Sequence, residues 1–247
     1  MTRPKRIGAL VPSTNQVVEP DFYSVAPKGV TIHTERMLCL PSKEKGGDSY
    51  QLNKLNEDIE RAAKYLRETD LDLITYACTS GTYHEGRWEY DRQIANLIEQ
   101  ASGLPCITAV HASVEALRKV GAQRISVAGP YGDKLLVRLK TLLEEMGFMV
   151  VSLEGEPKMK QRIHPAVIGN QDPEVIVDFV PKAIVREADS VYLPGTAWRA
   201  LEVVDKLEGI TGLPVITVNQ ATIWMALRKI GVTDPIQGFG RLLKMSL

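Results

Sequence analysis

The sequence predicts an α/β fold of two similar lobes, each with a parallel β-sheet, related by a pseudo-twofold axis. Three observations support this prediction. Apolar runs alternate with amphipathic stretches along the whole chain, which is the pattern of β-α units that feed a parallel sheet. A long segment from the middle of the chain recurs near its end. The length of 247 residues, of which 44% are hydrophobic and 24% charged, is enough for a sizeable core.

The strands are predicted from apolar runs, several of them rich in β-branched residues and therefore suited to a sheet that is covered on both faces. They span residues 7–12, 31–38, 71–77, 124–128, 148–153, 190–193 and 215–218. A helix follows most of these strands. The clearest amphipathic stretches span residues 51–68, 88–101, 112–120, 134–146, 173–187, 199–208 and 221–230. No low-complexity linker divides the chain.

The internal repeat relates the two halves residue by residue. Residues 103–121, which begin Gly-Leu-Pro-Cys-Ile-Thr, recur as residues 212–231, a copy that is one residue longer. Upstream of each copy, a strand ends in a turn. In this alignment Cys78 corresponds to Gly195, and a threonine follows each of them.

The first strand of each half also has a counterpart. Residues 7–13 (Ile-Gly-Ala-Leu-Val-Pro-Ser) are echoed by residues 125–131 (Ile-Ser-Val-Ala-Gly-Pro-Tyr). We therefore expect a first lobe formed by residues 1–115 together with 219–247, and a second lobe formed by residues 116–218.

Composition and charge exclude several classes of protein. Thirty Lys and Arg balance thirty Asp and Glu, so no net positive charge favours a phosphate backbone, and we expect no nucleic-acid partner. The apolar stretch 7–11 stops at Pro12 and is too short for a signal-peptide core. We therefore expect a cytoplasmic protein without a membrane partner. Oligomeric state stays open, and a homo-oligomer is compatible with the sequence.

Metal and nucleotide cofactors have no support in the sequence. The three cysteines include no C-x-x-C pair, and the four histidines have no ligand spacing, so neither a structural zinc site nor metal catalysis is expected. Neither a dinucleotide fingerprint nor a phosphate-binding loop of the G-x-x-x-x-G-K-[ST] type occurs. We expect an activity that needs no cofactor.

The candidate site is predicted where strands of both lobes end. Ligands of α/β sheets bind outside the carboxyl ends of the strands, which brings the loops 12–15, 78–82, 130–132 and 195–198 to one cleft. These loops offer small hydroxyl and amide donors, namely Ser13, Thr14, Asn15, Thr79, Ser80, Tyr131 and Thr196. Cys78 is the one strong nucleophile or proton carrier among them. The cleft therefore suits the binding of a substrate carboxylate by these donors and a reaction at the Cys78 thiol.

Cys78 has two interpretations. It ends an apolar strand and precedes Thr-Ser-Gly, where N–H dipoles of the next helical segment would stabilise a thiolate. Alternatively it is a small buried hydrophobe, the usual fate of a free cysteine. The hydroxyl-rich surroundings favour the reactive interpretation. Cys106 aligns with Val215 and is expected in the core, and Cys39 is expected to be structural.

The remaining polar candidates are expected to have mainly structural roles. His84 could assist Cys78 but is expected to be a solvated loop residue. Tyr131 is either a donor to a ligand carboxylate or a half-buried residue at the rim. Arg118 and Arg228, in the two Ala-Leu-Arg-Lys segments of the repeat, are expected to be solvated at helix ends.

Several motifs together resemble one known family. They are residues 7–15 (Ile-Gly-Ala-Leu-Val-Pro-Ser-Thr-Asn) with Glu19, residues 77–81 (Ala-Cys-Thr-Ser-Gly), the Gly-Pro-Tyr131 turn, Asp172-Pro173 and residues 215–221 (Val-Ile-Thr-Val-Asn-Gln-Ala). Over nearly the whole chain, their order resembles the arylmalonate decarboxylase and maleate cis-trans isomerase branch of the aspartate/glutamate racemase superfamily. This resemblance implies two α/β lobes with a cofactor-independent site between them.

The resemblance also implies roles for individual residues. In racemases of the superfamily each lobe supplies one cysteine, whereas here the two positions are Cys78 and Gly195. The decarboxylases have a single thiol, in the second lobe, and this chain has the mirror arrangement. By resemblance, Thr79 and Ser80 with Tyr131 and Thr196 stabilise negative charge on the substrate carboxylate. In the maleate isomerases the first-lobe cysteine attacks the alkene and an asparagine that matches Asn15 holds a carboxylate.

These features lead to three hypotheses. The first is decarboxylation of a malonate-type acid, in which Cys78 protonates the enediolate that remains. The neutral donors favour it, because a carboxylate that leaves as carbon dioxide should not be held by a full ion pair, and Arg199 lies only at the cleft margin. The second is maleate-type cis-trans isomerisation through a Cys78 adduct. The third is a binding protein for small acids without turnover.

Overall fold

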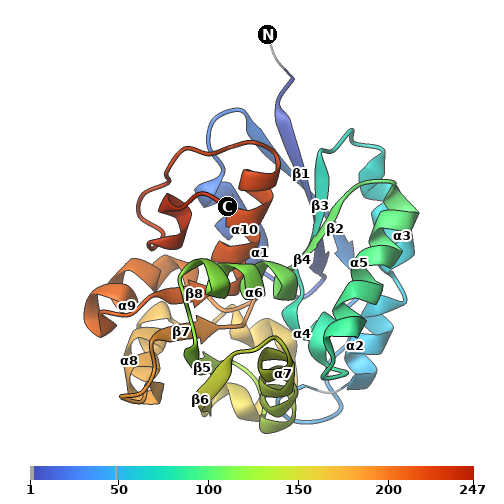
Figure 1. Cartoon of the computed structure of the whole chain (residues 1–247). Coiled ribbons are helices and arrows are strands. Elements are labelled where there is room, and N and C mark those ends of the chain that lie inside the picture. The colour runs from blue at the N-terminus through green and yellow to red at the C-terminus, as the bar shows by residue number, and fades with distance from the viewer. Residues whose placement is uncertain (1–2, 48) are drawn as a thin grey trace.

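The computed structural model describes residues 3–47 and 49–247 and contains two parallel β-sheets (Figure 1). The first sheet contains β1 (Lys5–Pro12), β2 (Val30–Met37), β3 (Leu73–Tyr76) and β4 (Cys106–Thr108). The second sheet contains β5 (Arg124–Gly129), β6 (Met149–Gly155), β7 (Ser190–Leu193) and β8 (Val215–Thr217). The predicted α/β fold with two similar lobes is confirmed.

The two sheets have the same topology. Their strand orders are β2-β1-β3-β4 and β6-β5-β7-β8, so each strand of the first sheet has its counterpart four strands later. All neighbouring strands are parallel, and β1 pairs with β2 along its whole length, from Lys5 opposite Val30 to Pro12 opposite Met37. In a parallel sheet the carboxyl ends of the strands lie at one edge, which is where both lobes carry the predicted site loops.

The helices cover the sheets and connect successive strands (Figure 1). They are α1 (Val18–Val25), α2 (Ser49–Asn56), α3 (Ile59–Arg67), α4 (Thr79–Tyr83), α5 (Trp88–Ser102), α6 (Ala109–Lys119), α7 (Asp133–Glu145), α8 (Pro173–Ala183), α9 (Val204–Thr211) and α10 (Val218–Lys229). Short 3-10 turns span Met159–Gln161, Pro165–Ile168, Leu201–Val203 and Leu242–Lys244. Within the described residues, no helix combines the length and the apolar character needed to cross a membrane.

The helices differ from the predicted ones in two respects. The stretch 51–68 contains two helices, α2 and α3, separated by a turn at residues 57 and 58. At the end of α2 the Nδ2 of Asn56 lies 2.8 Å from the carbonyl oxygen of Gly81. The helices α1 and α4 were not predicted, since both are shorter than the window in which helical periodicity can be detected. At the start of α1, Oδ1 of Asn15 accepts hydrogen bonds from the backbone N–H groups of Val17 and Val18.

The repeat helices α6 and α10 pack against each other and join the lobes (Figure 1). α10 follows β8 of the second sheet but also contacts α1 and β4 of the first lobe. Every residue of α10 from Val218 to Arg228 is buried, which is expected for a helix packed on all sides. The lobe boundaries at 115, 116, 218 and 219 stay a prediction, as does the cytoplasmic location.

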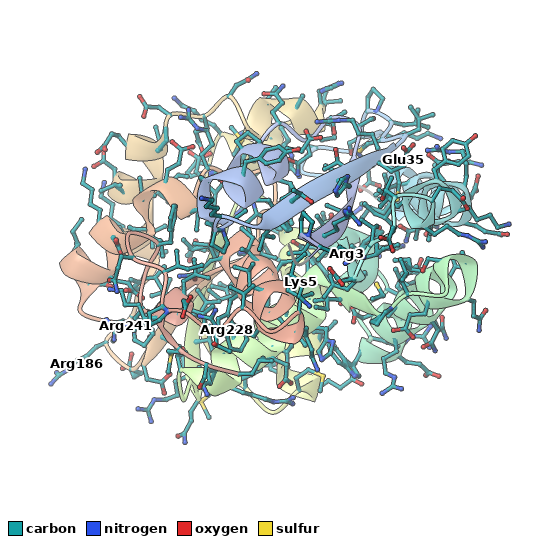
Figure 2. All side chains as sticks on the ribbon, turned by 90° about the horizontal axis from the view of Figure 1, so that it is seen from above. Arg3, Lys5, Glu35, Arg186, Arg228 and Arg241 are labelled. Atoms are coloured by element: carbon teal, nitrogen blue, oxygen red, sulfur yellow. The ribbon has the colours of Figure 1, made fainter. Side chains whose placement is uncertain are left out.

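Arg228 is buried, contrary to the sequence-based expectation of a solvated helix end. Its Nε lies 2.9 Å from the carbonyl oxygen of Met245, and its Nη1 and Nη2 lie 2.8 Å from those of Val232 and Leu243. Figure 2 shows Arg228 beside the C-terminal part of the chain, whereas Arg186 projects from the periphery. The planar guanidinium thus ties the segment after α10 to the helix.

We expect Arg228→Lys to lower the free energy of unfolding by about 2 kcal/mol, because an ammonium cannot reach three divergent carbonyl oxygens. The matched control is Arg118→Lys, at the equivalent repeat position, where the side chain is exposed and the cost should stay under about 0.5 kcal/mol. Urea unfolding midpoints of the two variants measure the difference. Equal midpoints would contradict the role assigned to Arg228.

Candidate active site

A small cavity lies where the carboxyl ends of the two sheets face each other. Its volume is about 60 Å³, well below the roughly 300 Å³ or more of pockets for drug-sized ligands. The first lobe contributes Asn15, Cys39, Cys78 and Ser80 to its lining, and the second contributes Tyr131, Arg162, Gly195 and Thr196. The remaining walls are largely apolar. The cavity therefore suits a short acid.

The structure brings most of the predicted site residues together and leaves two outside. Asn15, Cys78, Ser80, Tyr131, Gly195 and Thr196 all line the cavity. Thr79 is fully buried next to it, and its Oγ1, which lies near the Tyr131 hydroxyl, makes no hydrogen bond of good geometry within the described residues. Ser13 is exposed, and its Oγ accepts a hydrogen bond from the backbone N–H of Cys39 at 2.9 Å.

Cys78 is held as a protonated thiol. It follows β3 as the residue preceding α4, and it is 6% exposed. Burial raises its pKa to about 12, and a negative charge on Cys39 would act in the same direction. The Gly81 N–H and the side chains of Ser80 and Tyr76, which lie beside the sulfur, lower the pKa, but less. The expected thiolate is therefore not formed at neutral pH, because loss of hydration outweighs the N–H dipoles of a five-residue helix.

The surroundings of Cys78 are fixed by a close approach at Gly81. A Cβ atom added to Gly81 would lie 2.2 Å from the hydroxyl oxygen of Tyr76 and 3.1 Å from the sulfur of Cys78. The Tyr76 hydroxyl donates to Asn56 Oδ1, and the Nδ2 of Asn56 donates to the Gly81 carbonyl. Glycine is required here because any side chain would displace the hydroxyl that lies beside the thiol.

His84 is buried, so its interpretation as a solvated loop residue is wrong. Its Nε2 lies 2.7 Å from Asn53 Oδ1, and its Nδ1 lies 3.2 Å from the carbonyl oxygen of Ser80. Burial lowers the pKa of its imidazole. His84 links α2 to the end of α4 and does not line the cavity.

Neutral donors reach the cavity from both lobes. Tyr131 is buried, and its hydroxyl donates to the carbonyl oxygen of Pro194 at 3.1 Å and also interacts with Thr79 and Ser80. Burial raises the pKa of Tyr131 far above its usual value, so the hydroxyl keeps its proton. The Nδ2 of Asn15 lies 3.3 Å from Thr196 Oγ1, which links the two lobes at the cavity.

Gly195 is the residue equivalent to Cys78 in the second copy of the repeat, and the atoms around it leave no room for a side chain. A Cβ atom at Gly195 would lie 2.6 Å from Cγ of Pro130 and 3.0 Å from Cβ of Trp198. Gly129 has the reciprocal contact, since its Cβ would lie 2.9 Å from Cγ of Pro194. A second thiol at position 195 would therefore require the Pro130 ring to move.

Sequence analysis missed several cavity residues, of which two, Cys39 and Arg162, are ionisable. Cys39 was expected to be structural, but its sulfur faces the cavity and lies 3.1 Å from Nε2 of Gln51. Burial raises the pKa of Cys39. Arg162 places a cation at a cleft that was expected to be neutral. Both residues lie in the irregular segments that follow the equivalent strands β2 and β6, and this symmetry is the signal that could have found them.

Two buried carboxyl groups lie behind the cavity. Asp91 accepts a hydrogen bond from Thr108 Oγ1 at 2.8 Å, its Oδ1 has no partner among the described residues, and burial raises its pKa to about 7. Asp21 accepts from Nδ2 of Asn219 at 2.7 Å, and burial raises its pKa to about 7 as well. The same Nδ2 donates to the carbonyl oxygen of Thr196 at 2.9 Å, so Asp21 helps to position the Thr196 loop.

Within residues 3–47 and 49–247, no group of three or more His, Cys, Asp or Glu side chains is arranged to hold a metal ion. No carboxylate occurs among the residues that line the cavity. The chemistry available there consists of two thiols, neutral hydroxyl and amide donors, and the guanidinium of Arg162.

Comparison with known proteins places this arrangement in a family. A family model described as arylmalonate decarboxylase matches residues 7–243. The chain is 28% identical to a maleate isomerase from Pseudomonas putida over 98% of both chains, and 24% identical to an arylmalonate decarboxylase from Bordetella bronchiseptica over 96% of this chain and 99% of that protein.

The fold is shared with a solved structure of similar length. A mutant of the maleate cis-trans isomerase from Nocardia farcinica, which carries a covalently bound succinylcysteine intermediate, superposes with a TM-score of 0.86. The sequence identity is 23%, and the match covers 97% of this chain and 98% of the other.

The buried carboxyl of Asp91 should make the stability of the protein depend on pH. The unfolded chain loses this proton near pH 4, whereas the folded protein keeps it up to about pH 7, so stability falls as pH rises through this window. In the wild type, the Asp91 carboxyl should lower the free energy of unfolding by a few kcal/mol between pH 4 and pH 8, and Asp91→Asn should not show this decrease.

Chemical denaturation across this pH range, with the exposed Asp234→Asn as the control, measures the change. If Asp91→Asn and the wild type lose stability in parallel, the carboxyl does not keep its proton in the folded state.

Proposed function

The chain belongs to the arylmalonate decarboxylase family of enzymes, and we propose that within this family it decarboxylates a small malonate-type acid. Cys78 is the proton donor of this proposed reaction. The supporting observation is that the cavity contains a protonated thiol, Cys78, surrounded by neutral donors from both lobes, with no carboxylate in its lining. Membership of an enzyme family argues against a binding protein without turnover.

The proposed reaction makes direct use of these groups. When one carboxylate leaves as carbon dioxide, the electron pair of the broken bond passes into the remaining carboxylate and forms an enediolate. Hydroxyl and amide donors such as Ser80 and Asn15 stabilise this charge, each by a few kcal/mol at most, and the Tyr131 hydroxyl joins them by turning its proton from the Pro194 carbonyl to the substrate. The Cys78 thiol then gives its proton to the α-carbon, and the resulting thiolate takes a proton from solvent. The balance is a malonate dianion plus one proton, giving carbon dioxide and a monocarboxylate.

The raised pKa of Cys78 fits this role better than nucleophilic attack. A thiol that is protonated at neutral pH can donate its proton once a strongly basic carbanion forms beside it. A nucleophile would instead need the thiolate, which burial disfavours. The packing of Gly195 against Pro130 also fits a reaction with a single proton donor.

The second candidate is cis-trans isomerisation of a maleate-type acid. Its supporting observation is Cys39, a second thiol that lines the same cavity and acts electrostatically on Cys78. In this reaction the Cys78 thiol would give its proton to solvent, its sulfur would add to the alkene, and a second acid such as Cys39 would protonate the neighbouring carbon. After rotation about the carbon–carbon single bond, Cys39 would take the proton back, the carbon–sulfur bond would break, and Cys78 would regain a proton. The relative from Pseudomonas putida named above is a maleate isomerase, and Asn15, which would hold a carboxylate by resemblance to the isomerases, lines the cavity.

We expect Cys78→Ala to lower kcat by at least about 100-fold while the fold is retained, because the variant lacks its general acid. The assay measures carbon dioxide release from malonate and methylmalonate in deuterated water, where each turnover should place one deuteron on the α-carbon. Cys106→Ala, outside the cavity, is the matched control and should cost about 1 kcal/mol of stability without loss of turnover. Activity of Cys78→Ala within about threefold of wild type would contradict the mechanism.

Cys39→Ala separates the two candidate reactions. If the enzyme is a decarboxylase, this variant should retain kcat within about tenfold of wild type, because Cys39 takes no part in proton transfer. If the enzyme is an isomerase, conversion of maleate to fumarate should fall by at least about 100-fold, because the second acid is lost. Nuclear magnetic resonance of the products under identical conditions distinguishes decarboxylation from isomerisation, which conserves mass.

A further inference from the structure

Arg162 places a cation at the cavity, and this cation has no carboxylate partner among the described residues. Its Nη1 donates to the carbonyl oxygens of Met159, at 3.0 Å, and Pro130. Its Cζ lies 5.6 Å from the centroid of the Tyr131 ring. Within the part of the chain that the structure describes, no Asp or Glu forms an ion pair with Arg162.

The position of this cation is unfavourable unless an anion binds to it. Arg162 is half-buried, so its guanidinium loses part of its hydration, and the two carbonyl oxygens compensate only one of its nitrogen atoms. Burial lowers the pKa of Arg162, which is the expected effect where no anion offsets the loss of hydration. The guanidinium nevertheless remains charged at any physiological pH. It can therefore form a strong ion pair with a ligand that enters the cavity.

The guanidinium is offset from the donors that would stabilise an enediolate. Tyr131 lies between the two regions, with its hydroxyl directed toward Thr79, Ser80 and the Pro194 carbonyl and its ring facing Arg162. The Nη2 of Arg162 points toward Gly47, since a Cβ added there would lie 3.7 Å from it. A ligand that contacted both the neutral donors and the Arg162 guanidinium would need one anionic group for each of them.

We propose that Arg162 binds a second carboxylate of the substrate, one that the reaction does not remove. This inference rests on the proposed function and narrows its substrate class to short malonate-type acids with a carboxylate on the side chain. The reason is electrostatic. An ion pair with the departing carboxylate would stabilise the ground state and slow the loss of carbon dioxide, whereas an ion pair with a retained carboxylate keeps its full strength in the transition state.

Binding to a protein without turnover tests this inference independently of the reaction. In the Cys78→Ala background, calorimetry should show that succinate binds at least about tenfold more tightly than butyrate, which has the same carbon chain but one carboxylate. Adding Arg162→Met should lower the ratio of succinate to butyrate affinity at least tenfold, and Arg162→Lys should restore part of it. Lys160→Met is the matched control, because Lys160 pairs with Asp133 outside the cavity.

Turnover of two substrates completes the test. The kcat/KM of carboxymethylmalonate relative to methylmalonate should fall at least about 30-fold in Arg162→Met. An unchanged succinate to butyrate ratio in Arg162→Met overturns the inference even if methylmalonate is decarboxylated. The predicted binding ratio without decarboxylation of either acid supports the Arg162 subsite and contradicts the proposed reaction. Circular dichroism and thermal unfolding of each variant exclude misfolding as the cause.

Discussion

The packing of α10 between the lobes is the constraint on which the site depends. This helix follows the second sheet, yet it packs against α6, α1 and β4 of the first lobe and is buried on all sides. Because α6 and α10 are equivalent in the repeat, their contact brings equivalent ends of the two sheets toward each other. The cavity is then lined by loops from both lobes, and Asn15 can reach Thr196 across it. Arg228 extends the same packing to the C-terminal segment.

Loss of hydration determines the chemistry of this cavity. Burial raises the pKa of Cys78 and Cys39, so both sulfurs are available as proton donors, and it raises the pKa of Asp91 and Asp21 behind the site. The same effect leaves Arg162 with an unfavourable charge that a substrate anion would neutralise. A site of this kind favours reactions in which the charge that develops at the reacting carbon and its carboxylate is stabilised by fixed dipoles, while Arg162 can pair with an anionic group elsewhere on the substrate.

The order of short motifs along the chain was enough to identify the family, and the match over residues 7–243 confirms it. The motifs lie at the ends of the strands, where loop residues provide hydrogen-bond donors. The local sequence determines where each strand ends, so the positions of these donors can be predicted from it. Within the family, the reaction depends on a few side chains at the cavity. Cys78 takes part in both candidate reactions. The exclusion of a side chain at Gly195 supports the proposed decarboxylation, whereas Cys39 supports isomerisation, and the Cys39 variant separates the two.

The sequence by itself determined the α/β class, the two-lobed repeat and most of the cavity donors, because apolar periodicity and strand-end loops are local properties of the chain. It did not determine the state of Cys78, the burial of His84 and Arg228, or the presence of Cys39 and Arg162 at the cavity. These depend on which irregular segments fold over the carboxyl ends of the sheets. Such segments have no periodicity, and the hydration of each side chain is decided by residues distant in sequence that pack against it.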